Sequence, residues 1–127
     1  MSNDKIQKHT GKEYDLAERT AQFSENLITF LKTLSRDTIN RPLVYQATKS
    51  GTSIGANYME ADVAESKRDF VHKIGISRKE AKETMYWMRV IARANQDKKQ
   101  ECRYFYQEAE EFVKIFSTII SNTKLNS

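Results

Sequence analysis

A row of apolar residues near the C-terminus, repeating at alternating spacings of three and four, constrains the fold more than any other feature. The row consists of Cys102, Phe105, Ala109, Phe112, Phe116 and Ile119. Because an α-helix has about 3.6 residues per turn, residues at these spacings lie along one side of it. The pattern predicts an amphipathic helix over residues 99–122. Such a helix must bury its apolar side against other elements.

Three earlier segments carry similar patterns and predict helices over residues 15–34, 42–61 and 66–95. In the first, the stripe is Leu16, Phe23, Leu27, Phe30, Leu31 and Leu34. Pro42 suits the first turn of the second helix, and Ser66 with Asp69 resembles a capping box for the third. Short polar connections favour antiparallel neighbours. We therefore expect an all-α chain folded as an antiparallel up-down-up-down four-helix bundle.

Composition supports one helical domain over residues 1–127, with a flexible polar tail at residues 1–12. The 127 residues include one Pro and four Gly, too few for a turn-rich β-protein. No apolar run approaches the roughly 20 residues that span a bilayer, and the polar N-terminus does not resemble a secretory signal. The single Cys102 fits a reducing cytoplasm. We expect a cytoplasmic protein without membrane contact.

The second predicted helix is rich in small residues, namely Ser50, Gly51, Ser53, Gly55 and Ala56. Glycine inside a helix costs about 1 kcal/mol relative to alanine. We interpret these residues as a surface that lets a neighbouring helix approach closely.

The third predicted helix has apolar residues outside its main stripe. Ile76, Trp87 and Val90 fall within a sector of about 60° on the helical wheel, away from the centre of that stripe. Scattered exposed apolar residues are common. A subunit interface anchored by Trp87 is the interpretation that we favour, because buried tryptophan often dominates interface energies. The chain is therefore expected to form a homo-oligomer.

Basic residues form a second feature of the same helix. Lys67, Arg78, Lys82, Arg89 and Arg93 fall within a sector of about 80°. Residues 66–95 contain eight basic and three acidic side chains, so this helix holds the surplus of a chain with net charge +4. A basic stripe can be simply a solvated face. Repeated around an oligomer, it would form a basic surface able to contact RNA or DNA phosphates.

Candidate catalytic groups are few. Asp69 and His72 have the spacing of a helical metal-ligand pair, but the sequence has only two histidines, and the other is His9 in the tail. Cys102 lies on an apolar stripe, where a thiol usually packs rather than reacts. No glycine-rich phosphate loop is present. We expect a protein without enzymatic activity, metal or cofactor.

Residues 46–61 resemble the signature of the small four-helix-bundle proteins encoded in 23S rRNA intervening sequences. That signature has a Ser-Ile pair, then Asn three residues after the Ile and Glu three later, which Ser53, Ile54, Asn57 and Glu60 match. Residues 68–70 and 80–88 are similar to the third helix of the family. The resemblance is strong over residues 46–94 and extends to the outer helices only by pattern.

The resemblance implies a homopentamer with no established enzymatic activity. Related bundles are accessory proteins of retroelements, which suggests a nucleic acid or a nucleic-acid enzyme as partner. A protein-binding scaffold without a nucleic-acid role is the alternative. The matched polar residues are Ser53, Asn57, Glu60, Glu80 and Glu83. We interpret them as a structural polar layer, with Asn57 and Glu60 hydrogen-bonded between helices, because a buried polar group must be paired.

Overall fold

The computed structural model describes residues 15–125, which form four long α-helices and one short 3₁₀ turn. The helices are α1 (Leu16–Leu31), α2 (Asn40–Asp62), α3 (Lys67–Ala94) and α4 (Lys99–Leu125), with η2 (Gln96–Lys98) between the last two. This described part contains no strand, so the predicted all-α class is confirmed. The predicted tail over residues 1–12 lies outside the described residues.

The helix ends differ from the predicted ones by a few residues. α1 stops at Leu31, because the backbone amides of Thr33 and Leu34 turn to carbonyls three residues back, at 2.9 and 3.2 Å. Leu34 nevertheless stays buried with the core. α4 continues to Leu125, beyond the predicted end at residue 122.

Side-chain caps account for two of the helix starts. Ser66 accepts a hydrogen bond from the Asp69 amide at 3.0 Å, so the predicted cap of α3 is confirmed. α2 begins at Asn40, two residues before Pro42, because Asp37 Oδ1 accepts from the amides of Ile39 and Asn40 at 3.0 and 2.7 Å. Pro42 therefore still lies in the first turn, where its missing N–H costs nothing.

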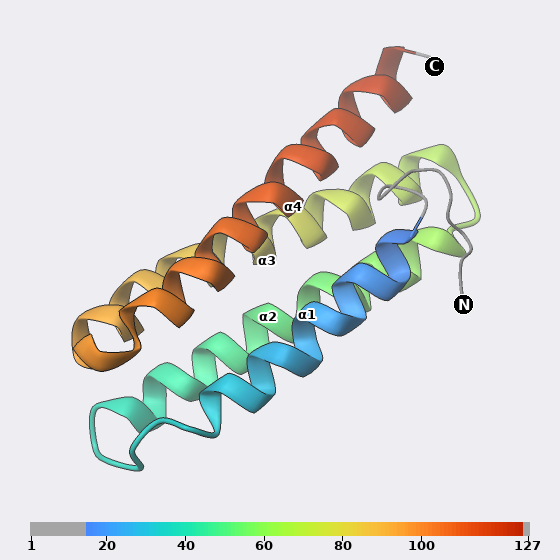
Figure 1. Cartoon of the computed structure of the whole chain (residues 1–127). Coiled ribbons are helices and arrows are strands. Elements are labelled where there is room, and N and C mark those ends of the chain that lie inside the picture. Colours follow the sequence, from blue (N-terminus) through green and yellow to red (C-terminus); the bar gives the residue numbers. More distant parts are fainter. Residues whose placement is uncertain (1–14, 126–127) are drawn as a thin grey trace, which may run out of the picture.

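Each helix runs back along the one before it, so the α1–α2 and α3–α4 connections lie at the same end of the molecule (Figure 1). α3 packs along both α2 and α4, and α1 packs along α2. Asn40 and Asn95 join the two connections by a reciprocal pair of amide hydrogen bonds, at 3.0 and 2.9 Å. The two turns at this end are thereby fixed to each other.

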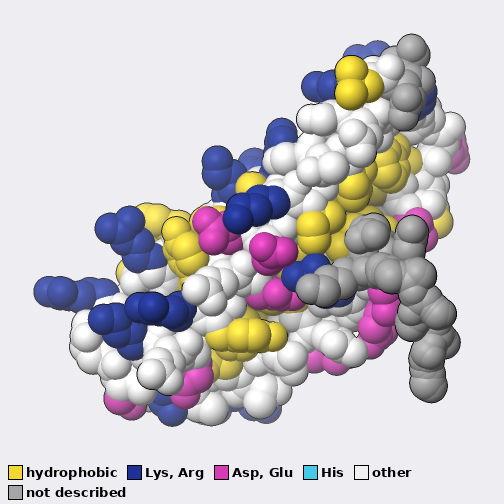
Figure 2. Space-filling view, turned by 45° about the horizontal axis from the view of Figure 1, so that its top comes forward, with side chains coloured by type: hydrophobic (Ala, Val, Ile, Leu, Met, Phe, Trp, Pro, Cys, Tyr) yellow, Lys and Arg dark blue, Asp and Glu magenta, His cyan; other side chains and the backbone are white. Residues whose placement is uncertain are grey.

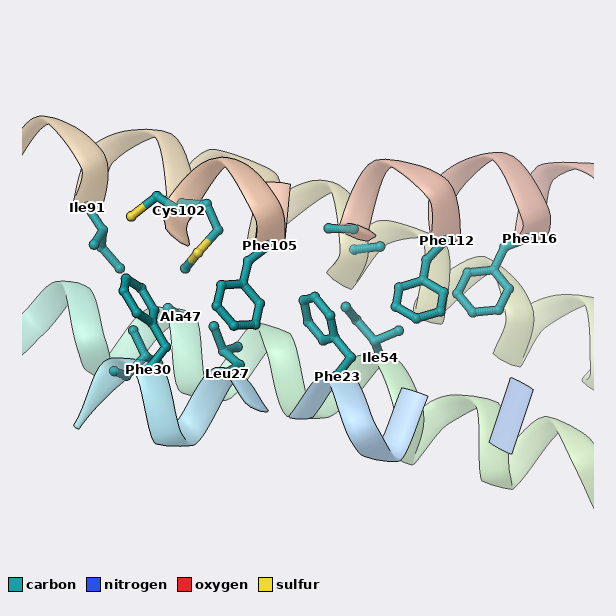
Figure 3. Packing of buried hydrophobic residues seen from close by; sticks show 14 of the residues in the cluster. Phe23, Leu27, Phe30, Ala47, Ile54, Ile91, Cys102, Phe105, Phe112 and Phe116 are labelled. Carbon is teal, nitrogen blue, oxygen red and sulfur yellow. The ribbon is translucent and has the colours of Figure 1, made fainter. Parts of the chain in front are cut away.

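Long aromatic side chains fill the space between α1 and α4, whose backbones make few direct contacts. The Phe23 ring of α1 meets Phe105 and Phe112 of α4 edge to face, with centroids 5.7 and 5.5 Å apart (Figure 3). Phe30 stacks on Phe105 at 5.3 Å. These geometries are the favourable ones for aromatic pairs.

A partly buried ion pair joins the same two helices nearer the start of α1. Arg19 Nε and Nη2 donate to the two carboxylate oxygens of Glu108 at 2.8 and 3.0 Å. The guanidinium also lies 5.1 Å from the centroid of the Phe112 ring. A two-point pair of this kind fixes geometry as well as adding attraction, so it sets how α1 sits on α4.

The apolar stripes predicted for the first and last helices form much of the core. All six residues of the first predicted stripe are buried, including Leu34 just beyond the end of α1. Five of the six in α4 are buried as well, whereas Ile119 is half buried and its neighbour Ile120 is buried. In α2 and α3 the innermost apolar residues are Ala47, Ile54, Ala61, Ile74, Ala81, Met88 and Ile91. The core therefore follows the periodicity of the sequence.

Gly51 and Gly55 lie where α1 crosses α2. A β-carbon added at Gly51 would overlap Cδ2 of Leu27, and one added at Gly55 would fall 3.0 Å from Oγ1 of Thr20. The Leu27 side chain would have to move to admit the first of these. The predicted close approach of a neighbouring helix is therefore found here, and the neighbour is α1.

We predict that Gly51→Ala destabilises the fold although alanine favours helix. Overpacking a core costs about 1–3 kcal/mol, whereas the gain in helix propensity is about 1 kcal/mol. Gly75→Ala in α3 is the matched control, because a β-carbon added there would have no neighbouring atom within 4 Å. Urea unfolding should show a lower free energy for Gly51→Ala and a higher one for Gly75→Ala. Equal stabilisation by both substitutions would contradict the close contact.

Candidate functional site

The five basic residues predicted as a stripe occupy one flank of α3 but do not share one environment. Lys67, Lys82, Arg89 and Arg93 are exposed, whereas Arg78 is half buried. Arg78 Nη1 donates to Ser117 Oγ of α4 at 3.2 Å. This flank of α3 therefore faces α4, and Arg78 has a structural contact there.

Arg89 and Arg93 border a hollow of about 530 Å³ between the end of α3 and the start of α4. Lys99 and Arg103 of α4 border it from the other side, so four cations surround it. The remaining lining residues are Met88, Ala92, Gln96, Cys102 and Tyr106. No carboxylate lines the hollow, and none of the four cations forms an ion pair with a carboxylate of residues 15–125. We call this feature the basic hollow.

The charges of the basic hollow are arranged at a local electrostatic cost. Arg89 and Arg93 are four residues apart on one helix, as are Lys99 and Arg103, and like charges at this spacing destabilise a helix by about 0.2–0.5 kcal/mol per pair. Lys99 also begins α4, where the helix dipole disfavours a cation. Arg93, in the last turn of α3, is favoured there.

Lys and Arg side chains gather visibly over the end of the molecule where α3 turns into α4 (Figure 2). Sequence reasoning found Arg89 and Arg93 but missed Lys99 and Arg103. The four-residue spacing of Lys99 and Arg103 was a signal, but it became meaningful only once α3 and α4 were known to be neighbours.

The predicted apolar interface residues lie on the other flank of α3, and Ile76, Trp87 and Val90 are all half buried. Trp87 packs against the edge of the core, and its Nε1 donates to Glu83 Oε2 at 3.2 Å. The Tyr86 ring meets it edge to face at 4.9 Å and is 58% exposed. Sequence reasoning missed this exposed tyrosine, which extends the flank outward.

Within residues 15–125, the residues of the predicted polar layer do not form a single hydrogen-bonded layer. Ser53 and Asn57 donate to carbonyls of their own helix, those of Lys49 and Ser53, at 2.6 and 2.9 Å. Glu60 does bridge two helices, because Lys73 Nζ of α3 donates to its Oε1 at 2.7 Å. That bond lies at the surface, however, where the Glu60 side chain is 57% exposed.

Glu80 and Glu83 lie on the α3 flank that carries Trp87. Burial and the neighbouring charge of Glu83 raise the pKa of Glu80 above its usual value, and Lys49 is among the cations that partly offset this. Glu83 is exposed. The two carboxylates are therefore close enough to influence each other, and neither belongs to a buried hydrogen-bonded layer with Asn57.

The buried polar contacts between α2 and α3 are made by small hydroxyl residues instead. The hydroxyls of Ser50 and Thr84 are hydrogen-bonded at 2.8 Å, and Ser77 donates to the Ile54 carbonyl at 3.0 Å. All three hydroxyl residues are fully buried or nearly so. Small polar residues suit this place, because they satisfy their hydrogen bonds while the helices stay close.

The residues considered for catalysis do not come together. Burial, with a smaller effect of Glu101, raises the pKa of the Cys102 thiol to about 11, so it is protonated at neutral pH. Among residues 15–125, no group of three or more His, Cys, Asp or Glu side chains could hold a metal ion. None of the described helices combines the length and apolarity that crossing a membrane requires.

Comparison with known proteins identifies the family. A family model for the 23S rRNA-intervening sequence protein matches residues 12–118. The chain belongs to this family. The resemblance predicted from residues 46–94 is therefore confirmed and extends over most of the chain.

A solved structure shares both the fold and part of the sequence. It is the crystal structure of a protein of unknown function from the S23 ribosomal protein family of Bacteroides thetaiotaomicron, which is similar with a TM-score of 0.76 and 30% identity. The similarity covers 83% of this chain and 97% of that chain. A search of curated proteins found no match.

We predict that Thr84→Val lowers the free energy of unfolding by about 1–3 kcal/mol, because it leaves the Ser50 hydroxyl buried without its partner. The double variant Ser50→Ala/Thr84→Val should recover part of this loss, since removing both partners is less costly than removing one. Thr52→Val, at a half-buried hydroxyl bonded within α2, is the control. Strictly additive effects in urea unfolding would contradict the pairing.

Proposed function

We propose that the chain is a non-enzymatic homo-oligomer that binds the phosphates of RNA or DNA through its basic hollow. The observation that carries the proposal is the meeting of Arg89, Arg93, Lys99 and Arg103 around one hollow with no carboxylate in its lining. Phosphate oxygens would relieve the repulsion between these cations. Arginine suits this role, because its guanidinium presents two donors to one phosphate.

The other lining residues fit a nucleic acid as well. Gln96 offers amide donors and acceptors, and Tyr106 offers an aromatic ring on which a base can stack. Contacts of this kind add little sequence preference. Membership of a family named for 23S rRNA intervening sequences is consistent with this role.

Assembly would multiply the charge. We propose that the antiparallel bundles associate through the flank of α3 that carries Ile76, Trp87 and Val90, extended by the exposed Tyr86. A pentamer is the assembly that the family resemblance implies. Five copies of the basic hollow on one particle would bind a single nucleic acid more tightly than one copy does. Such a particle suits the reducing cytoplasm, where its buried thiol needs no partner.

A protein scaffold or adaptor is the second candidate, and a nucleic-acid enzyme is the kind of partner that it would hold. The exposed aromatic residues on α3 and α4, Tyr86 and Tyr104, favour it, because tyrosine is enriched at protein interfaces. Binding that survives nuclease treatment would distinguish it from nucleic-acid binding.

We predict that Arg89→Gln/Arg103→Gln weakens binding to a short labelled single-stranded RNA at least tenfold. It should also flatten the plot of log affinity against log salt by ~0.7 for each phosphate that the variant no longer neutralises. Fluorescence anisotropy at several salt concentrations measures both quantities. Lys79→Gln/Lys114→Gln is the matched control, because it removes two exposed positive charges outside the basic hollow. Equal losses in both variants, or an affinity insensitive to salt, would exclude the proposed site.

We predict that Val90→Glu reduces the solution mass of the assembly, because it places a charge in the proposed interface without removing a core side chain. Light scattering measures the mass directly. Val63→Glu is the control, at a residue that is 76% exposed between α2 and α3. A wild-type chain that is monomeric at micromolar concentration would rule out the interface and the pentamer together.

A further inference from the structure

A second hollow, of about 390 Å³, lies where α1 passes into α2. This connection is at the same end of the bundle as the connection between α3 and α4 (Figure 1). The apolar wall of the hollow is made by Ile28, Leu31, Leu34 and Val44. Ile28 is 41% exposed although it lies in a helix beside the core. Volumes of about 300–1,000 Å³ with mostly apolar walls are typical of small-molecule sites.

Three cations border this apolar wall, namely Lys32, Arg36 and Arg41. No carboxylate lines the hollow, and none of the three forms an ion pair within residues 15–125. The nearby carboxylate of Asp37 has another task, because its Oδ1 accepts the amides that begin α2. A rim with three cations around an apolar wall favours a ligand that has both an anionic and an apolar part.

The position of Arg41 adds to the positive potential. It lies in the first turn of α2, which contains no acidic residue, although the Asp37 carboxylate just before it accepts the first amides of the helix. A bound anion would therefore be attracted mainly by the side chains of Lys32, Arg36 and Arg41. The apolar wall, in turn, would be covered by a hydrocarbon or aromatic body attached to that anion.

We propose that this hollow binds a small amphipathic carboxylate, with its apolar body against Ile28, Leu31 and Val44 and its anionic end among Lys32, Arg36 and Arg41. A bare phosphate would leave the apolar wall exposed to water, so an anion with an attached apolar body fits this hollow better. The site does not depend on the proposed nucleic-acid function, since the two hollows share no lining residue.

The test adds decanoate to the full chain. Calorimetry measures its binding, and amide chemical shifts around the α1–α2 turn show where it binds. Decanoate below its micelle concentration should bind saturably, with one molecule per chain. Decanol, which has the same apolar body without the charge, should bind at least tenfold more weakly, and acetate should not bind. Equal binding of decanoate and decanol would overturn the proposal, as would several molecules bound per chain.

Two variants separate the parts of the site. Arg36→Gln/Arg41→Gln should weaken decanoate at least tenfold and leave decanol unchanged, whereas Lys79→Gln/Lys114→Gln, outside the hollow, should change neither. Ile28→Glu places a carboxylate at a partly exposed position and should abolish decanoate binding with the helical circular dichroism unchanged. If decanoate binds the Arg36/Arg41 variant as tightly as it binds the wild type, the proposal is wrong. Binding of an acidic peptide at this end would not change that conclusion.

Discussion

The packing of α1 against α2 depends on the missing side chain of Gly51. The Leu27 side chain of α1 lies where a β-carbon would be, so it packs directly on the backbone of α2. On its other side α2 meets α3 through Ser50 and Thr84, which are also small. α2 thus carries small residues toward both neighbours. The wider space between α1 and α4 is filled by the rings of Phe23 and Phe105.

Both hollows bordered by cations lie near the two connections at one end of the bundle. The Asn40–Asn95 pair joins them, and a positively bordered hollow lies on each side of the joint. The same end also concentrates positive charge that the core does not need for stability.

Sequence periodicity predicted the helices and their buried sides well, because the 3.6-residue repeat is a local property that each segment carries by itself. The cap of α3 was equally visible, since Ser66 and Asp69 are three residues apart. The start of α2 was missed because Asp37 lies in a polar connection in which many residues could act as a cap. Leu34 belongs to the core without belonging to the helix, a distinction that periodicity cannot make.

The site was harder to predict, because it depends on which helices are neighbours. Arg89 and Arg93 were found on α3, but their counterparts Lys99 and Arg103 joined them only in three dimensions. Cys102 lines the same hollow yet is almost wholly buried and holds its proton at neutral pH. An alkylating reagent can reach this thiol only when α3 and α4 separate locally. The rate at which Cys102 is alkylated therefore reports how often α3 and α4 separate at this end of the bundle.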